Sequence, residues 1–172
     1  MPRNVEIKAK VNDLEAMLKK ALLLSGSQSE IIKQKDVFFN CQNGRLKLRF
    51  FSSSSGELIF YTRDNSVEPK SSNYQISKTR RPKELRKILA RAYGEKAIVK
   101  KKRTLILIGR TRIHLDDVKD LGTFVELEVV LKKNEPSSSG KKEALDLMNK
   151  LGILENNLIS GAYADLLEQA VP

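Results

Sequence analysis

Charged and apolar residues alternate along residues 110–131, and this alternation constrains the fold more than any other feature of the sequence. Successive side chains of an extended strand point to opposite faces. One face of a first strand then carries Arg110, Arg112, His114 and Asp116. Glu126 and Glu128 share one face of a second strand, and residues 119–122 form the turn. The segment predicts a β-hairpin with arginines on one arm and paired carboxylates on the other, which suits a metal-bound polyphosphate.

Similar alternation elsewhere predicts six more strands. They span residues 5–11, 31–39, 45–51, 57–63, 73–78 and 97–108. In the strand at 45–51, Arg45, Lys47 and Arg49 form a basic row on one face. Like charges on one face repel each other unless anions or carboxylates lie opposite them. The row therefore points to an anionic ligand or to acidic partners on neighbouring strands.

Apolar residues at helical spacing predict four helices between and after these strands. The first covers residues 13–24, with Asn12 and Glu15 as a capping box. A second starts at Pro82, a third follows a serine-rich linker at 132–140, and a short one ends the chain. Residues 64–72 lack an apolar period and are expected to form a loop. Eight antiparallel strands with four helices predict an α+β fold, and eight strands are enough to close a ligand-holding barrel.

The composition fits one globular domain over residues 1–172, with 40% apolar residues. The net charge of +11 favours an anionic partner. Cys41 and His114 are the sole cysteine and histidine, which excludes thiol zinc clusters and multi-histidine metal sites. The sequence shows neither an apolar signal core nor a run of about 20 apolar residues. We therefore expect a soluble cytoplasmic protein without a membrane partner.

Several short motifs occur in a fixed order along residues 4–167 and together resemble the CYTH superfamily. They are Glu6-x-Lys8, Gln34-x-Asp36-x-x-Phe39, Gly44-Arg45-Leu46-Lys47-Leu48-Arg49, Lys101-x-Arg103, Arg112-x-His114-Leu115-Asp116, Glu126-x-Glu128 and Tyr163-x-Asp165-Leu166-Leu167. This superfamily contains the triphosphate tunnel enzymes, among them class IV adenylate cyclases and thiamine triphosphatases. The resemblance implies an eight-stranded antiparallel β-barrel with a charged lumen and helices packed outside.

The resemblance also implies roles for individual residues. The expected phosphate-binding residues are Lys8, Lys47, Arg49, Arg63, Lys101, Arg103 and Arg112. Glu6, Glu126 and Glu128 are the expected ligands of Mg²⁺ or Mn²⁺, with Asp116 as a further ligand or support. Lys8, Arg112 and Asp116 are the residues expected to act in catalysis.

One position departs from the family pattern. The signature Glu-x-Glu-x-Lys falls on Asn4, Glu6 and Lys8, so an amide replaces the first carboxylate. An amide oxygen can coordinate Mg²⁺ but brings no charge, so metal affinity should fall and a second metal becomes doubtful. A register with Glu6 first and Lys10 as the lysine would put Lys8 at the second acidic place, and it fits the following residues badly.

The His114-Leu115-Asp116 pattern and the short chain favour the cyclase branch, which converts ATP to cyclic AMP and pyrophosphate. A triphosphatase acting on thiamine triphosphate or inorganic triphosphate stays open, as does a phosphate-binding module weakened in catalysis by Asn4. A basic nucleic-acid binder is the third and weakest alternative, because the sequence has no tryptophan and no regular interleaving of aromatic and basic residues. Phe50 and Phe51, with the other phenylalanines, are assigned to the core. A monomer and a homodimer fit equally well.

Overall fold

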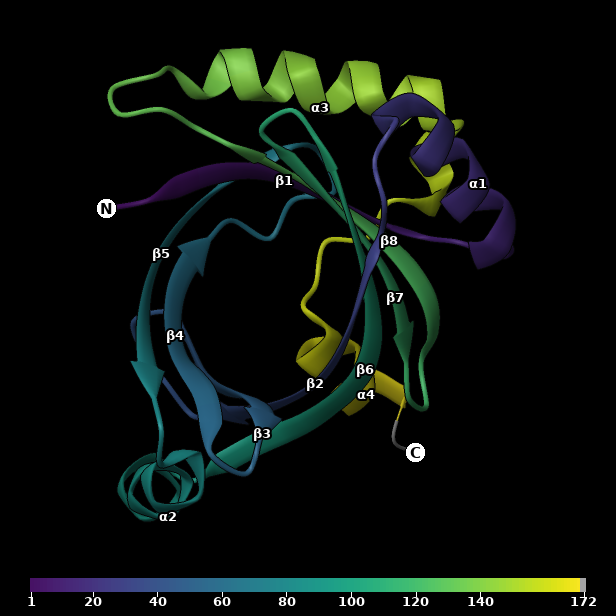
Figure 1. Cartoon of the computed structure of the whole chain (residues 1–172). Coiled ribbons are helices and arrows are strands. Elements are labelled where there is room, and N and C mark those ends of the chain that lie inside the picture. Colours follow the sequence, from purple (N-terminus) through teal and green to yellow (C-terminus); the bar gives the residue numbers. More distant parts are fainter. Residues whose placement is uncertain (171–172) are drawn as a thin grey trace.

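The computed structural model describes residues 1–170, and within that range eight antiparallel strands close into a barrel (Figure 1). The strands are β1 (Arg3–Lys10), β2 (Glu30–Phe39), β3 (Arg45–Ser52), β4 (Ser55–Arg63), β5 (Lys70–Thr79), β6 (Glu95–Ile108), β7 (Thr111–Val118) and β8 (Gly122–Val130). Their order around the barrel is β1-β5-β4-β3-β2-β6-β7-β8. The predicted barrel is therefore confirmed.

Four α-helices lie outside the barrel wall in the part of the chain that the structure describes. They are α1 (Leu14–Ser25), α2 (Pro82–Tyr93), α3 (Ser137–Leu151) and α4 (Tyr163–Ala170). A short 3-10 helix spans Glu155–Asn157. Figure 1 shows α1 and α3 beside β1 and β8, and α2 at the opposite side of the barrel. The helices thus cover the wall from outside, and Tyr163 at the start of α4 reaches the barrel interior.

The main apolar core lies between the barrel wall and helices α1 and α3. Val5, Ile7 and Leu127 project outward from β1 and β8 and pack with Ala144 and Leu147 of α3. Each large apolar side chain buried in this way stabilises the fold by about 1.5–3 kcal/mol. Because the core is outside the barrel, the alternate side chains of the same strands are free to be polar and to face the lumen.

Helix α3 begins at Ser137, so the predicted linker over residues 132–140 is wrong in its second half. The cause is close packing at Gly140. A Cβ at Gly140 would lie 2.7 Å from Leu131 Cδ2 and 2.8 Å from Val5 Cγ2. The absence of a side chain lets the first turns of α3 approach the barrel wall, and this contact outweighs the weak helix propensity of serine and glycine.

Smaller differences concern the ends of other elements. The N-cap of α1 is Asp13, whose carboxylate accepts a hydrogen bond from the Ala16 amide, and not Asn12. Strand β5 starts at Lys70 instead of residue 73, because its first residues pair with β1 at Glu6 and Val5. Among residues 1–170 the structure contains no helix with the length and apolar content that a membrane crossing requires.

Candidate active site

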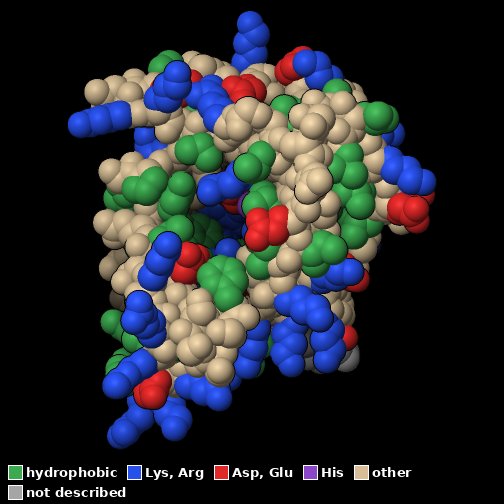
Figure 2. All heavy atoms as spheres, in the orientation of Figure 1, with side chains coloured by type: hydrophobic (Ala, Val, Ile, Leu, Met, Phe, Trp, Pro, Cys, Tyr) green, Lys and Arg blue, Asp and Glu red, His purple; other side chains and the backbone are tan. Residues whose placement is uncertain are grey.

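A cavity of about 320 Å³ runs inside the barrel, and every strand contributes residues to its lining. Figure 2 shows its mouth as a hollow near the centre of the view, with basic side chains inside. The basic lining residues are Lys8, Lys47, Arg49, Arg63, Lys101, Arg103 and Arg112. The acidic lining residues are Glu6, Asp36, Glu57, Glu126 and Glu128. The basic side chains of the lining therefore exceed the acidic ones by only two.

Asp36 holds three of these cations in place from β2. Its carboxylate accepts hydrogen bonds from Arg49 Nε and Nη2, both at 2.8 Å, and from Lys47 Nζ at 3.1 Å. Lys101 Nζ lies 3.8 Å away. Burial by itself would raise the pKa of Asp36, but the charges of Arg49 and Lys47 outweigh it and hold that pKa well below its usual range. Asp36 therefore stays ionised and fixes the orientation of the two β3 cations.

Asp116 fixes the orientation of Arg103 in the same way. Arg103 donates from Nε and Nη2 to the two carboxylate oxygens at 2.8 Å, and the Tyr163 hydroxyl donates to Oδ2 at 2.8 Å. Asp116 has no exposed surface. Burial alone would raise the pKa of Asp116. The charges of Arg103 and Lys101 outweigh burial and lower that pKa to about 2. The carboxylate is thus placed to position Arg103, and its expected catalytic role stays a prediction.

Glu126, Glu128 and His114 form an acidic cluster on β7 and β8. One ligand atom from each lies within 4.8 Å of the other two. The strand register sets Glu6 directly opposite Glu128 on the neighbouring strand β1, so its carboxylate faces the same part of the tunnel. These are the three carboxylates that the sequence analysis assigned to a metal. His114 joins them because it pairs across the ladder with Glu126.

Each carboxylate of this acidic cluster also has a basic neighbour. Glu126 lies 3.3 Å from Lys8 Nζ and 3.2 Å from Arg103 Nη2, and Glu128 lies 2.9 Å from Arg112 Nη2. Glu6 is ion-paired with Arg63. The pKa of Glu126 is held well below its usual range, because burial, which raises it, is outweighed by Lys8, His114 and Arg103. Basic neighbours likewise lower the pKa of Glu128 against the effect of burial, so both glutamates of the cluster are charged.

The residues present fit a hard divalent cation. Carboxylate and amide oxygens are the ligands that Mg²⁺ and Mn²⁺ prefer. The Asn4 side chain is 3% exposed, and its Oδ1 has no hydrogen-bond partner among the described residues. Asn4 lies two residues before Glu6 on the tunnel face of β1. A buried acceptor without a donor is unfavourable unless water or a cation occupies the adjacent space.

The segment before α4 approaches one end of the tunnel (Figure 1). Lys8 Nζ donates to the Gly161 carbonyl at 3.1 Å and lies 3.8 Å from the centroid of the Tyr163 ring. Lys70 Nζ donates to the Ser160 carbonyl at 3.2 Å. Lys8 of the tunnel and Lys70 of β5 therefore tie the C-terminal segment to the barrel.

Every residue that was predicted to bind phosphate lines the tunnel, and so do the predicted metal ligands Glu6, Glu126 and Glu128. Asp116 lies behind Arg103, as described above. Arg110 was expected on the same face as Arg112, and this was wrong. It lies in the turn before β7, where it binds Glu135 and Glu143 outside the tunnel, because the strand begins only at Thr111.

The sequence analysis gave no role to two residues that organise the tunnel. Asp36 lies two residues after Gln34 and therefore on the same, inward face of β2. This spacing in the sequence could have indicated that Asp36 faces the tunnel. Lys70 fell in the predicted loop, so nothing in the sequence pointed to it.

Burial leaves three lysines in or beside the tunnel partly neutral near pH 8. Burial first, and then the charge of neighbouring arginines, lowers the pKa of Lys101 to about 7 and that of Lys47 and Lys70 to about 8. A bound polyphosphate would restore their usual pKa by its negative charge. Binding should therefore take up protons, and affinity should fall as pH rises through this window.

We expect calorimetry at about pH 8.5, run in two buffers of different ionisation enthalpy, to record uptake of protons when tripolyphosphate binds. Lys47→Arg should reduce this uptake, because a guanidinium stays protonated. Equal heats in both buffers would contradict the expectation.

A family model described as "CYTH domain" matches residues 2–163. The PH1012 protein of Pyrococcus horikoshii OT3 has a similar solved structure, with 21% identity, a TM-score of 0.85, and coverage of 95% of this chain and 98% of that one. A Vibrio parahaemolyticus protein described provisionally as an adenylate cyclase has 17% identity, a TM-score of 0.75, and coverage of 96% and 97%.

The Hippeastrum protein HpAC1 is also similar, at 12% identity with a TM-score of 0.62 and coverage of 94% of this chain and 91% of that one. It is described as a provisional adenylyl cyclase with a dominant triphosphatase activity. No curated protein sequence matches this chain significantly. At these identities the structural likeness establishes the fold.

Proposed function

This chain belongs to the CYTH domain family, and on that premise we propose that its tunnel binds a nucleoside triphosphate with Mg²⁺ or Mn²⁺ and cleaves it as a class IV adenylate cyclase does. The observation that carries the proposal is the meeting of seven inward cations with the acidic cluster inside one narrow cavity. Cleavage of a triphosphate depends mainly on positioning and on charge neutralisation, which such a tunnel supplies.

The two aspartate-bound arginines would hold the phosphates. A guanidinium carries five N–H donors in a rigid fork. Arg49 gives two hydrogen bonds to Asp36, and Arg103 gives two to Asp116. The remaining donors keep a fixed direction, because Asp36 and Asp116 are buried and immobile. Such preorganised donors bind phosphate oxygens without paying for reorientation on binding.

Glu126, Glu128 and Glu6, with the amide oxygen of Asn4, would hold the metal ion. When bound, a divalent ion neutralises phosphate charge and polarises the bond that is cleaved. The position of Arg112 beside Glu128 would place a cation on the phosphates next to the metal.

In the cyclase reaction the ribose 3′-oxygen forms a bond to the α-phosphorus, and the bond from that phosphorus to the bridging oxygen breaks. Pyrophosphate leaves with the electron pair, and the 3′-hydroxyl proton passes to a base. Lys8 is our candidate for that base, because burial lowers its pKa and favours its neutral form. The products of the reaction would be cyclic AMP and pyrophosphate.

The tunnel also has apolar lining residues that suit an organic group. Leu105 pairs across the ladder with His114, and Ile76 follows Tyr74 two residues later on β5. Burial would lower the pKa of Arg112, but Glu128 and then the nearby Tyr74 raise it above its usual value. Tyr74 therefore lies close to Arg112 in the tunnel. A base or other organic moiety could therefore rest beside the phosphates, which favours an organic over an inorganic triphosphate.

A triphosphatase is the second candidate, with water in place of the ribose hydroxyl. The cavity volume of 320 Å³ supports it, because this is near the lower end of the roughly 300–1,000 Å³ typical of ligand pockets. The description of HpAC1 points the same way.

The test is to incubate the purified protein with ATP, thiamine triphosphate or tripolyphosphate, each with Mg²⁺ or Mn²⁺, and to identify the products. Cyclic AMP and pyrophosphate would support the cyclase, whereas free phosphate would support the triphosphatase. Absence of turnover on all three substrates would overturn both and favour a phosphate-binding module.

Replacing the Asn4 amide by an isosteric carboxylate should strengthen metal binding. Asn4→Asp adds a negative charge beside Glu6 and Glu128, so we expect roughly tenfold tighter Mn²⁺ binding by calorimetry. Without metal the same variant should unfold at a lower temperature, because three carboxylates then repel one another.

The matched control is Gln34→Glu. Its amide oxygen is also buried and unpartnered among the described residues, but it lies beside Lys101, away from the acidic cluster. It should leave Mn²⁺ affinity unchanged. If Asn4→Asp binds Mn²⁺ no better than the parent, Asn4 does not contact the metal.

A further inference from the structure

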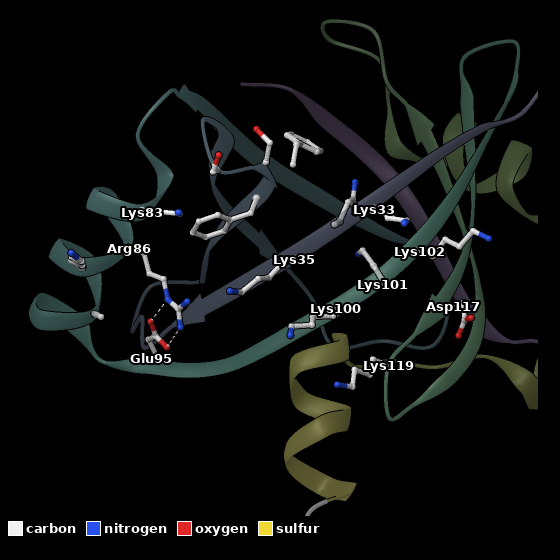
Figure 3. Close-up of a pocket in the computed structure, with 17 residues that line it drawn as sticks. Lys33, Lys35, Lys83, Arg86, Glu95, Lys100, Lys101, Lys102, Asp117 and Lys119 are labelled. Carbon is white, nitrogen blue, oxygen red and sulfur yellow. Dashed lines mark hydrogen bonds and ion pairs between the residues drawn. The ribbon is translucent and has the colours of Figure 1, made fainter.

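A hollow larger than the tunnel lies outside the barrel, where β2 and β6 turn their outer faces to solvent beside α2 (Figure 3). Its volume is about 1130 Å³. We call it the outer basic groove, and its outward-facing basic residues are Lys33, Lys35, Lys83, Arg86, Lys87, Lys100, Lys102 and Lys119. Lys101 borders the groove, but its ammonium lies toward Asp36 and Asp116 of the barrel interior. Only Glu95 and Asp117 are acidic among its lining residues. Most of the protein's positive excess is thus gathered here and not in the tunnel.

The register of β2 and β6 sets like charges directly opposite each other on the outer face. Lys33 faces Lys102, and Lys35 faces Lys100. Directly opposed like charges destabilise a sheet. In the described part of the chain no acidic side chain is ion-paired with any of these four lysines. The fold therefore keeps two repulsive pairs side by side.

Asp117 of β7 lies opposite Lys102, while the other acidic side chain of the groove, Glu95, is already ion-paired. Arg86 of α2 donates to its two oxygens at 2.6 and 2.9 Å, as Figure 3 shows. Lys35 lies near Arg86 and Lys100, and its pKa is lowered by partial burial and then by those two charges. An anion from outside the chain is what would relieve this crowding of cations.

Two aromatic rings line the same groove. Phe51 is 40% exposed, and Lys35 Nζ lies 5.3 Å from the centroid of the Phe50 ring. Both rings were assigned to the core from the sequence, and this was wrong for Phe51, whereas Phe50 packs partly against the core. An exposed ring among lysines is the combination that binds single strands, since bases stack on the ring while cations meet the phosphates.

The spacing of the lysines fits the same ligand. Residues two apart on a strand are separated by about 6.6 Å, so Lys33 and Lys35 can meet neighbouring phosphates of an extended strand. Lysines bind as point charges and read no base edge. The groove is therefore suited to a phosphate chain of any sequence.

We propose that the outer basic groove binds single-stranded nucleic acid, with phosphates along the opposed lysine pairs of β2 and β6 and a base stacked on Phe51. This site is separate from the tunnel and does not depend on the proposed cleavage reaction. Binding is independent of sequence and weakens steeply with salt, because it rests on neutralised phosphates.

The experiment measures fluorescence anisotropy of a labelled RNA of about 12 nucleotides that ends in a 5′-hydroxyl, so no triphosphate can enter the tunnel. Lys33→Glu with Lys35→Glu turns both like-charge pairs into opposite-charge pairs, so this double variant should fold with an unchanged or higher melting temperature. Its affinity for the RNA should fall at least tenfold at about 0.1 M salt. Phe51→Ala should cost at least about fivefold, the loss of one stacked base.

The matched control is Lys141→Glu with Lys142→Glu, which makes the same change in net charge on exposed positions of α3. It should change affinity less than threefold, and the tunnel variant Lys47→Ala should bind the RNA like the parent. Equal losses in both double variants would overturn the proposal, because net charge alone would then explain binding. Insensitivity to Phe51→Ala, with inorganic polyphosphate competing as well as RNA, would also overturn it in favour of a general polyanion surface.

Discussion

Replacing Glu126 and Glu128 together with glutamine should remove metal-dependent turnover, by at least about 100-fold, since even a supporting partner of a metal site can be worth that much. Both side chains keep their shape but lose the charge that holds a divalent cation. The loss should appear in kcat and in the Mn²⁺ concentration needed for half activity. Substrate KM should not rise, because Lys8, Arg103 and Arg112 lose neutralising partners and become freer to bind phosphate.

Glu57→Gln is the control for that prediction. Glu57 also lines the tunnel, on β4, but it lies opposite Arg49 and outside the acidic cluster. The same chemical change there should leave the metal requirement as it is. If the two substitutions reduced kcat equally, the effect would come from the overall tunnel charge, and the metal assignment would be wrong.

Arg103→Met should lower the free energy of unfolding by about 3–5 kcal/mol, the usual effect of removing one partner from a buried ion pair. The substitution keeps most of the aliphatic volume but leaves Asp116, which has no exposed surface, with Tyr163 and with Lys101 at 3.9 Å. Urea denaturation at about pH 7 measures the change.

The pH dependence of this deficit has a definite sign. Asp116 has a folded pKa of about 2, below the ordinary aspartate value of 3.8. Its contribution to stability is therefore present above the unfolded pKa and is lost as pH falls through the folded one. The difference between Arg103→Met and the parent should shrink across that acidic window, where the carboxylate becomes neutral in both proteins.

Arg110→Met provides the comparison. Arg110 also binds two carboxylates, those of Glu135 and Glu143, but its side chain is 28% exposed and lies outside the tunnel. Solvent screens that pair, so its removal should destabilise the protein much less. If Arg103→Met and Arg110→Met lowered the free energy of unfolding equally, burial of the Arg103–Asp116 pair would add nothing to its contribution to stability.

The barrel itself could be predicted because alternation is a local property. On β1 the parity of Asn4, Glu6 and Lys8 against Val5 and Ile7 already separates a polar from an apolar face, whatever the rest of the chain does. The same reasoning placed Lys47 and Arg49 on one face of β3. Chain order and short turns then left few ways to close eight strands.

The partners of these charges could not be predicted, since they depend on which strands lie side by side. Asp36 became the anchor of Lys47 and Arg49 only through the register of β2 with β3. Lys70 and the serine-rich start of α3 were misassigned, because pairing with β1 and close packing at Gly140 override weak local preferences.

The sequence by itself determined that the inner faces of the strands are charged, since side-chain direction follows from strand period and needs no distant contact. Only the tertiary structure decided how those charges are used. Closure of the barrel buries Asp36 and Asp116 and brings arginines to hydrogen-bond distance from them. The arginine charges outweigh burial and lower the pKa of both aspartates, and the aspartates in turn orient the arginines. The register of β2 with β6 likewise decided that the remaining lysines oppose one another outside the wall. Both results depend on distances between residues far apart in the chain, and electrostatic energies follow distance and burial, not sequence order.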